Sequence, residues 1–263
     1  MGIFVTVVDA FTDRPFRGNP AAVCILDAPA DDAWMQQVAK EMNLSETAFC
    51  IAEGEIWNLR WFTPAVEVDL CGHATLATTH VLATDRGIEG TIRYTTRSGL
   101  LAAQALPEGI VLDFPADSSR GTEAPTGLLA ALGVPADTPV RRGRTDYLVS
   151  VESEAEVRAL KPNFGLLRRV DCRGVMVTAE ADDESDYDVV SRFFAPAVGV
   201  DEDPVTGSAH TTLAPYWSAR LERSRVRFHQ ASARGGELEV NLVGDRVEIF
   251  GQAVTTMRGE LFV

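Results

Sequence analysis

The sequence feature that most constrains the fold is an internal repeat spaced by about half the chain. Residues Phe62–Asp69 read FTPAVEVD and Phe194–Asp201 read FAPAVGVD, so six of eight positions match at an offset of 132 in a chain of 263 residues. Each copy is followed by a glycine and an apolar, Ala/Thr-rich run, which begin at Gly72 and Gly207. Self-similarity at the half-length predicts two homologous halves, each with one loop-to-helix motif.

The chain length and one polar stretch indicate how these halves are divided. A chain of 263 residues is long enough for two domains of about 130 residues each. The stretch Pro115–Pro125 is polar and contains proline and glycine, which is typical of a linker. We therefore predict an N-terminal domain over residues 1–117 and a C-terminal domain over residues 118–251.

Three helices are predicted, and one of them indicates the fold. The first covers Ala33–Met42 and is capped by one of the two aspartates before it, and the others follow Gly72 and Gly207. The run Ala74–Ala83 is apolar on most sides, so its helix has to be buried, and a sheet curled around it would bury it. We predict an α+β fold of two pseudo-symmetric domains, each a β-barrel-like curled sheet around a central helix.

Most of the remaining sequence is predicted to form strands. The evidence is the β-branched and aromatic content of short runs that are separated by turn residues. These runs are Ile3–Asp9, Ala21–Leu26, Thr47–Ala52, Ile56–Phe62, Thr91–Thr95, Leu100–Ala105, Ile110–Phe114, Tyr147–Val151, Gly174–Ala179, Val189–Phe194, Val226–Gln230, Glu237–Val243 and Arg246–Phe250.

Composition excludes several kinds of partner. The net charge of −14 repels nucleic-acid phosphates, so no nucleic-acid partner is expected. No apolar run reaches about 18 residues, so no membrane span is expected. The N-terminus lacks the features of a signal peptide, which predicts a cytoplasmic location. The four scattered cysteines should stay reduced there, with Cys24, Cys50 and Cys172 in the core and Cys71 in a loop.

The sequence contains none of the common motifs for cofactors or metals. It has no phosphate-binding P-loop, no G-x-G-x-x-G after a strand, and no zinc-type spacing of His and Cys. A pyridoxal enzyme needs a Schiff-base lysine, and neither Lys40 nor Lys161 has an evident site around it. We therefore expect an enzyme that works without a cofactor or a metal.

The two glycine-to-helix motifs predict an anion-binding cleft. A glycine at the start of a helix leaves the first N–H groups open to a ligand, and the helix dipole adds partial positive charge. Such ends bind carboxylates well. If the halves pack about a pseudo-twofold axis, both ends face one cleft, which suits a small carboxylate. The alternative is that Gly72 and Gly207 only form tight turns.

Three polar residues near these helix ends, together with Glu46, are candidates for the site. His73 and Ser208 occupy the same place in the two halves. Asp203 lies just before the second helix, where it could equally serve as a helix cap. Glu46 follows the first helix among apolar neighbours that would partly withdraw it from water, which favours acid–base catalysis, although it could also be a surface residue.

Seven segments along almost the whole chain form a specific pattern. In chain order they are Val8–Thr12, Gly18–Val23, Asn43–Phe49, Arg60–Pro64, Cys71–Thr75, Asp203–Ala209 and Gly251–Val254. Together they resemble the phenazine-biosynthesis PhzF-like family, which has the diaminopimelate-epimerase fold. The resemblance implies that the last strand, about residues 252–263, returns to the first domain. It also implies a homodimer.

The same resemblance implies roles for individual residues. Glu46 matches the glutamate that moves a proton between carbon atoms of an unsaturated, cyclic acid. His73, Asp203 and Ser208 match residues that line the site. Residues Gly72 and Gly207 match the backbone positions that bind the substrate carboxylate, and Asn19 is a further candidate within a matching segment.

One departure bears on the mechanism. Related epimerases use two cysteines, one before each helix. Cys71 resembles the first of them, but the position of the second cysteine falls at about Val205 or Thr206 in this chain. This favours an isomerase with one acid–base group, Glu46. Two alternatives remain: a racemase or epimerase of amino or hydroxy acids that uses Cys71, and a binding or regulatory protein that kept the cleft without turnover.

Overall fold

A computed structural model describes residues 2–262 and has a mixed α+β fold. By its internal contacts the chain divides into two compact units. The first comprises Met1–Phe114 with Glu248–Val263, and the second comprises Pro115–Val247. The assignment of residues 1–117 and 118–251 to two domains stays a prediction.

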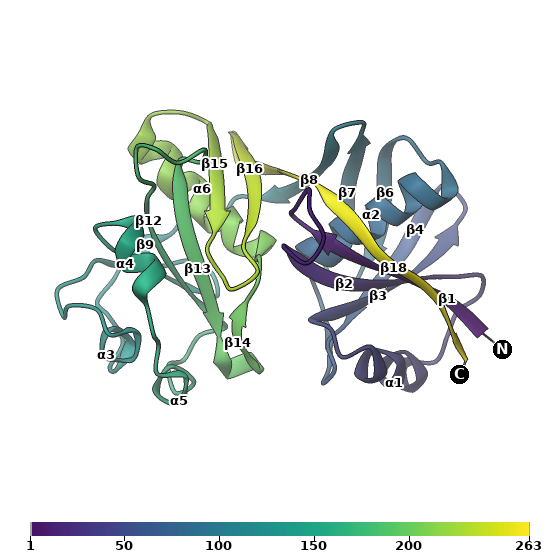
Figure 1. The fold of residues 1–263 in the computed structure, drawn as a ribbon, viewed down its shortest axis with the longest axis horizontal. Helices are drawn as coiled ribbons and strands as arrows, with labels where there is room; N and C mark the ends of the chain where they lie inside the picture. The colour runs from purple at the N-terminus through teal and green to yellow at the C-terminus, as the bar shows by residue number, and fades with distance from the viewer. Residues whose placement is uncertain (1, 263) are drawn as a thin grey trace. The chain divides into compact units, whose positions relative to one another are not determined.

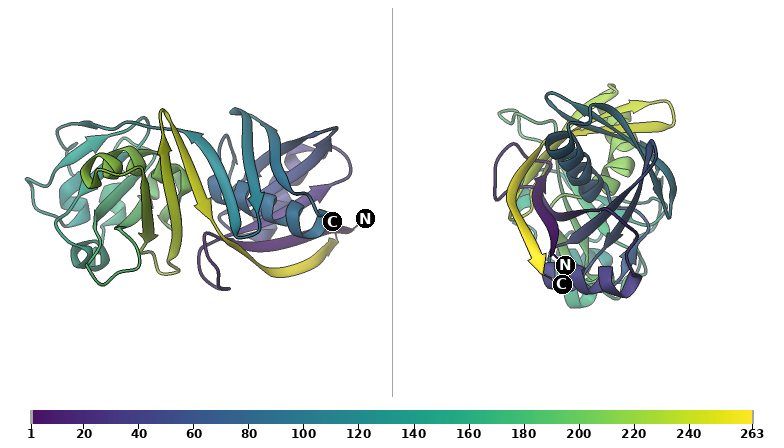
Figure 2. Two further views of the ribbon diagram at one scale, coloured as in Figure 1. Left: turned by 90° about the horizontal axis from the view of Figure 1, so that it is seen from above. Right: turned by 90° about the vertical axis from the view of Figure 1, so that its right-hand side faces the viewer.

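The first unit is built on a mixed sheet. Neighbouring strands follow the order β18, β1, β2, β3, β4, β6, β7, β8, in which the pairs β2–β3 and β4–β6 are parallel and the others antiparallel. β1 and β18 pair from Gly2 opposite Phe262 to Ala10 opposite Ala253, which brings the two ends of the chain together (Figures 1 and 2). The strands are β1 (Gly2–Ala10), β2 (Asn19–Leu26), β3 (Glu46–Glu53), β4 (Ile56–Phe62), β6 (Gly90–Thr96), β7 (Gly99–Leu106), β8 (Gly109–Pro115) and β18 (Ala253–Phe262).

Helix α2 (Gly72–Arg86) is the buried helix of this unit. It packs against β1, β2, β3, β7 and β18, so strands from widely separated places in the sheet contact it (Figure 1). Its hydroxyl groups are satisfied internally, because Thr75, Thr78 and Thr79 donate to carbonyls four residues earlier at 2.6, 2.7 and 2.8 Å. The predicted burial of this helix is confirmed.

Helix α1 (Asp32–Met42) packs beside β3 and β4. Asp31 is its N-cap residue and accepts hydrogen bonds from the N–H groups of Ala33 and Trp34 at 2.8 and 3.3 Å. The helix ends at Asn43, whose left-handed conformation turns the chain into β3.

The strands of the second unit are also paired in a mixed, parallel and antiparallel, arrangement. Its strands follow the order β9, β10, β11, β12, β13, β15, β16, in which β11–β12 and β13–β15 are parallel. Helix α6 (Gly207–Leu221) packs against β15 and β16, and the indole N–H of Trp217 donates to Thr178 on β12 at 3.0 Å. The strands are β9 (Arg120–Gly121), β10 (Val140–Arg142), β11 (Tyr147–Ser150), β12 (Val175–Glu180), β13 (Val189–Ala195), β15 (Arg225–Gln230) and β16 (Gly236–Val243), and β17 (Arg246–Gly251) leads back to the first unit.

Helix α6 contains a proline that the surrounding structure accommodates. Pro215 has no N–H group, so the carbonyl of Thr211, four residues earlier, lacks its helical partner. The N–H of Asp117 donates to that carbonyl at 3.0 Å instead. This hydrogen bond joins the polar segment after β8 to α6.

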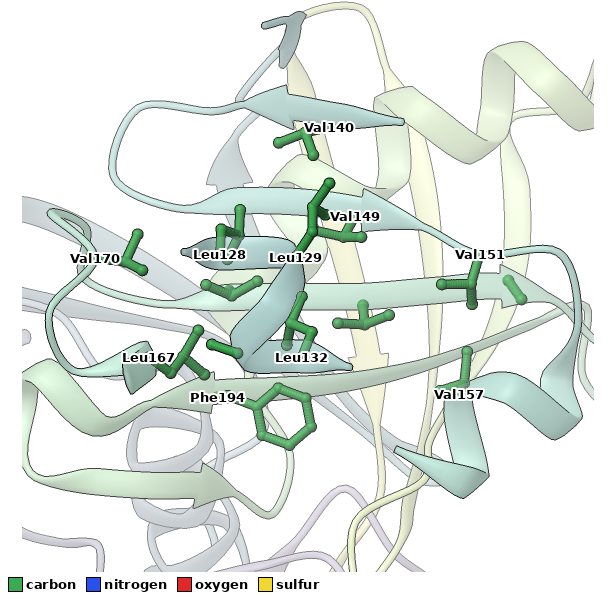
Figure 3. Close-up of a cluster of buried hydrophobic side chains, with 14 of the residues drawn as sticks. Leu128, Leu129, Leu132, Val140, Val149, Val151, Val157, Leu167, Val170 and Phe194 are labelled. Carbon is green, nitrogen blue, oxygen red and sulfur yellow. The ribbon is translucent and has the colours of Figure 1, made fainter. Parts of the chain in front are cut away.

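Three short helices cover an apolar core in this unit. They are α3 (Leu128–Leu132), α4 (Glu154–Ala159) and α5 (Phe164–Leu167). Figure 3 shows Leu128, Leu129 and Leu132 of α3 pointing toward strand residues such as Val149, with Phe194 nearby. None of these helices was predicted, because four to six residues are too few for a recognisable helical period.

The internal repeat forms the same local structure in both units. In the first, β4 is followed by β5 (Glu67–Val68) and then α2; in the second, β13 is followed by a 3₁₀ turn (Pro196–Val198), β14 (Val200–Asp203) and α6. Both helices have 15 residues. The structure also extends the repeat to an arginine–glutamate pair. Arg60 binds Glu67 through two hydrogen bonds of 2.7 and 2.8 Å, and Arg192 binds Glu202 through two of 2.7 and 2.9 Å.

The strand pairing corrects one detail of the repeat. Trp61 lies opposite Val68, and its counterpart Phe193 lies opposite Asp203. Trp61 and Phe193 are therefore 132 positions apart in the sequence, whereas their partners Val68 and Asp203 are 135 positions apart. Gly72 and Gly207 are also 135 positions apart. The final Val-Asp of the sequence match is consequently out of structural register, because the second copy has three extra residues before its helix.

The predicted strands are all confirmed, with ends that differ by a few residues. Cys24 and Cys50 are buried in strands. Cys172 differs from the prediction, since it is only partly buried, in a bend before β12 where it packs against the core cluster. All four cysteines are free thiols. Within residues 2–262, no helix has the length and apolar character needed to span a membrane.

Candidate active site

Two strand ends and one helix end meet in the first unit. β2 and β3 pair in parallel with Ala21 opposite Glu46, so Asn19 at the start of β2 and Glu46 at the start of β3 lie at the same end of the sheet. The residue before Asn19 has to be glycine. Gly18 has φ +65°, and a Cβ there would lie 2.1 Å from the carbonyl oxygen of Ala10.

His73, in the first turn of α2, is the centre of this group. Its Nε2 lies 3.1 Å from Oε2 of Glu46, and its Nδ1 lies 3.2 Å from Nδ2 of Asn19 and 3.5 Å from Sγ of Cys71. The side chain of His73 is 5% exposed and that of Glu46 is 17% exposed. Four predicted site residues thus lie together, and Glu46 retains access to solvent.

The contacts of His73 indicate where it carries its proton. Because Asn19 Nδ2 donates to Nδ1, a neutral imidazole has its proton on Nε2, facing the carboxylate of Glu46. Burial by itself lowers the pKa of His73, but the neighbouring Cys71 and Glu46 outweigh it, so the pKa lies well above its usual value. His73 is therefore suited to keep a proton beside Glu46.

Cys71 is the N-cap residue of α2, and its side chain makes no capping hydrogen bond. Burial raises the pKa of its thiol, and the charge of Glu46 raises it further. The thiol is therefore poorly suited to act as a base at neutral pH.

The equivalent end of α6 carries a different set of groups. Thr206 is its N-cap residue, so Thr206, not Val205, holds the place of Cys71. The Thr206 hydroxyl donates to Oδ2 of Asp203 at 2.5 Å, and its N–H donates to Oε1 of Gln230 at 2.9 Å. Gln230 also donates to the carbonyl of Asp203 at 2.8 Å. The predicted site residue Asp203, at the end of β14, is thus joined by hydrogen bonds to Thr206 and Gln230 just before Gly207.

An arginine reaches Ser208 in the first turn of α6. Arg173 Nη1 donates to Oγ of Ser208 at 3.0 Å. Its Nε donates to Oδ1 of Asp146 at 2.9 Å, and its Nη2 contacts Oδ2 of the same carboxylate. The side chain of Asp146 is almost fully buried, whereas that of Arg173 is about one-third exposed. Since Ser208 Oγ accepts from a cation, its own hydroxyl hydrogen is available to another acceptor.

The sequence reasoning missed Arg173, Asp146 and Gln230. A signal for two of them was present, because Asp146 and Arg173 directly precede the predicted strands that begin at Tyr147 and Gly174. Those strands pair in parallel, with Tyr147 opposite Val175, so the residues before them are neighbours. The parallel pairing itself could not be read from the sequence.

His210 has a structural role. It is fully buried, and its Nδ1 lies 2.8 Å from the carbonyl oxygen of Thr206, to which it donates. Its ring meets Phe228 edge-on. Burial lowers its pKa to about 4, so the ring is neutral near pH 7 and fixes the first turn of α6.

Within residues 2–262, one group of side chains could hold a metal ion. Glu46, Cys71 and His73 offer an oxygen, a sulfur and a nitrogen donor, all within 4.8 Å of one another. The sequence gave no indication of this group, because Glu46 is 25 residues away from Cys71 along the chain.

Comparison with known proteins places the chain in a family. Residues 8–259 match the family described as phenazine biosynthesis-like protein. An uncharacterized isomerase of Pseudomonas aeruginosa is 52% identical over 257 residues, which cover 97% of this chain and 96% of that protein.

Solved structures agree with this assignment. A phenazine biosynthesis protein of the PhzF family from Enterococcus faecalis is 42% identical and superposes with a TM-score of 0.95, with 100% of both chains covered. A hydroxyproline epimerase from Agrobacterium vitis shares the fold at 12% identity, with a TM-score of 0.67 over 99% of this chain and 92% of that one. This chain therefore belongs to the PhzF, or phenazine biosynthesis-like, family and is an isomerase.

Proposed function

We propose that this isomerase moves a proton between two atoms of a small, cyclic or unsaturated carboxylate, without a cofactor, and that Glu46 is the single acid–base group. The observation that carries the proposal is the contact of 3.1 Å between Oε2 of Glu46 and Nε2 of buried His73. A carboxylate that is partly withdrawn from water beside a proton-holding imidazole is a suitable acid–base catalyst.

The proton follows a simple path in this proposal. The Glu46 carboxylate takes a proton from the carbon α or vinylogous to the substrate carboxylate. Its conjugate acid then returns the proton to another position of the same molecule, which completes an isomerisation with no net change in atoms or electrons. His73 supports the transfer through its charge and position, and Asn19 fixes the orientation of the imidazole ring.

The helix ends supply groups that bind an anion. Neither α2 nor α6 has a side-chain cap, so the N–H groups near Gly72 and Gly207 are candidates for carboxylate recognition. Ser208 adds a hydroxyl donor, and Arg173 is the residue that positions it. Asp203 is proposed to support the proton transfer.

The finer architecture belongs to the same proposal. We infer that each unit is a curled sheet around its principal helix and that the two arose by duplication. The repeated strand, turn and helix support this inference, as do the pairs Arg60–Glu67 and Arg192–Glu202. A homodimer remains part of the proposal through the family resemblance.

Racemisation by Cys71 is the second candidate function. The shared fold of the hydroxyproline epimerase favours considering it. However, a two-thiol mechanism needs a second cysteine, and Thr206 stands at the equivalent N-cap position. The raised pKa of Cys71 also disfavours the thiolate.

Solvent deuterium exchange tests the main proposal. The purified protein is incubated in D₂O with a panel of cyclic and unsaturated carboxylates, and deuterium incorporation is followed by NMR and mass spectrometry. The wild type should exchange at least one compound, and Glu46→Gln should abolish this exchange. Glu41→Gln, at an exposed position of α1, is the matched control and should behave as the wild type. Exchange that persists in Glu46→Gln would overturn the role of Glu46.

A further inference from the structure

The group around His73 contains two buried polar atoms that contact each other. Oε2 of Glu46 and Nε2 of His73 lie 3.1 Å apart, and the described residues give neither atom a further hydrogen-bond partner. Polar atoms in a buried site need partners, and an ion bound among these side chains would supply one. The sulfur of Cys71 lies 3.5 Å from Nδ1 of the same imidazole ring.

The chemistry of these donors selects a class of metal. A thiol and an imidazole prefer zinc and similar transition metals, whereas Mg²⁺ and Ca²⁺ require oxygen ligands. Three ligands of the Cys, His and Glu types match those of zinc sites in which the fourth position is left open. With the carboxylate and thiolate both charged, the ligands would balance the two positive charges of Zn²⁺.

The spacing of the donors is close to that of a tetrahedral site. Zinc bonds of about 2.0–2.3 Å place neighbouring donor atoms about 3.3–3.6 Å apart. All three donors already lie within 4.8 Å of one another, and the contacts of 3.1 and 3.5 Å to the His73 ring fall near the tetrahedral values. These two contacts involve different ring nitrogens, so binding through Nε2, which Glu46 already faces, requires the Cys71 side chain to rotate toward that nitrogen. Glu46 can adjust its position to admit the ion because its side chain is 17% exposed.

We propose that Glu46, Cys71 and His73 form a Zn²⁺ site with an open fourth position, and that the bound ion inhibits the isomerase. Binding is a coordination reaction without redox change. The thiol of Cys71 loses its proton to the solvent, its sulfur forms a bond to Zn²⁺, and a water molecule occupies the open position. Binding itself does not depend on the proposed reaction, but the inhibition rests on Glu46 being the acid–base group.

Asn19 is positioned to support this site. Its amide lies 3.2 Å from Nδ1, the nitrogen that would remain free if Nε2 bound the ion. Residues that hold the second nitrogen of a histidine ligand orient the ring, and their loss typically weakens metal binding about 10–100-fold. A rotated Asn19 amide would accept from Nδ1–H and fill this role.

Titration calorimetry with ZnCl₂ tests the site on the full chain after treatment with EDTA and dialysis. The wild type should bind one equivalent of Zn²⁺, with no comparable binding of Mg²⁺ or Ca²⁺. Cys71→Ser should weaken Zn²⁺ binding by about 100-fold or more, since the effect of losing a ligand exceeds that of losing a supporting residue. Cys172→Ser is the matched control, because that partly buried thiol lies outside the group, and it should bind as the wild type does.

A spectroscopic measurement distinguishes coordination from an indirect effect on folding. Co²⁺ in place of Zn²⁺ should give a near-ultraviolet band from thiolate-to-metal charge transfer in the wild type and in Cys172→Ser. The band should be absent in Cys71→Ser, whose circular dichroism and unfolding temperature should remain those of the wild type. Equal Zn²⁺ affinity in the wild type and Cys71→Ser, or no saturable binding by the wild type, would overturn the site.

Inhibition separates this proposal from the proposed function. One equivalent of Zn²⁺ should stop the deuterium exchange of the wild type, and EDTA should restore it. A further outcome is that Zn²⁺ binds with one equivalent and requires Cys71, but deuterium exchange continues. This result would support the metal site and contradict its inhibitory effect. It would also count against the role of Glu46 as the acid–base group. If no carboxylate exchanges deuterium at all, the proposed function fails, while calorimetry and the cobalt spectrum still decide the site.

Discussion

The N-terminal ends of α2 and α6 share their local backbone but differ in chemistry. Both follow a short strand, begin with a glycine and lack a side-chain cap. The end of α2 holds Glu46, Cys71 and His73 in a buried group of titratable side chains. The end of α6 holds Thr206 in a hydrogen-bonded turn, with Ser208 bound by Arg173. On the proposed function, both helix ends offer N–H groups to a carboxylate, and the first also carries Glu46 as the acid–base group.

This difference predicts that neutralising Glu46 at the end of α2 lowers the rate of proton exchange more than neutralising Asp203 at the end of α6. Glu46→Gln should lower the rate of proton exchange by about 1,000-fold or more, the upper range for loss of a general acid–base group. Asp203→Asn should lower it by about 10–100-fold, because that side chain supports the transfer without carrying the proton. Both rates are measured by deuterium exchange on the same carboxylate. A larger effect for Asp203→Asn would reverse the assignment of roles.

His73 of α2 and His210 of α6 should respond to pH in opposite directions. His210 has a folded-state pKa of about 4, below its unfolded value of about 6.5, so its contribution is fully present above pH 6.5 and lost as the pH falls toward 4. This loss amounts to about 3 kcal/mol of unfolding free energy at most. His73 has a raised pKa, so its contribution is present below pH 6.5 and lost as the pH rises through the folded-state value.

Urea unfolding at a series of pH values measures both effects. In His210→Gln, the free energy of unfolding should fall less than in the wild type between pH 6.5 and 4. In His73→Gln, it should fall less than in the wild type as the pH rises above 6.5. The prediction of opposite pH responses would be contradicted if both variants changed the free energy of unfolding in the same pH range.

The third prediction concerns the positioning of Ser208. Arg173→Met removes the donor to Ser208 and leaves the buried carboxylate of Asp146 without its cation. We expect KM to rise about 10–150-fold with a smaller change in kcat, since a lost charged hydrogen bond amounts to about 1.5–3 kcal/mol. Arg173→Lys should restore part of the affinity. Arg168→Met is the control, because Arg168 is exposed and pairs only with the carboxylate of Asp201 and a carbonyl. A fall in kcat with unchanged KM would contradict the positioning role.

The smallest effect is expected at Cys71. Cys71→Ala should change the exchange rate by no more than about 3-fold, because its thiol is held protonated by burial. Thr206→Ala, at the equivalent position of α6, is the companion variant. A drop of more than about 100-fold for Cys71→Ala alone would favour the thiol-based racemase or epimerase.

The limits of sequence reasoning follow from particular residues. The positions of Glu46, His73 and Asp203 were predictable because each lies next to a helix end, and capping residues and glycines mark such ends locally. The contacts of Arg173 with Asp146 and Ser208 were not, because they join residues that are 27 and 35 positions apart along the chain. The pairing of β11 with β12 that brings these loops together is parallel and carries no turn signal.

The sequence by itself determined the repeat, the strands, the two long helices and the set of residues at their N-termini. These features depend on side-chain periodicity and on glycine, which act over a few residues. Only the tertiary structure decided that Thr206 is the counterpart of Cys71, that His210 fixes a helix turn, and that His73 lies between Glu46 and Asn19. Those relations depend on strand register, and register is fixed by the packing of the whole sheet.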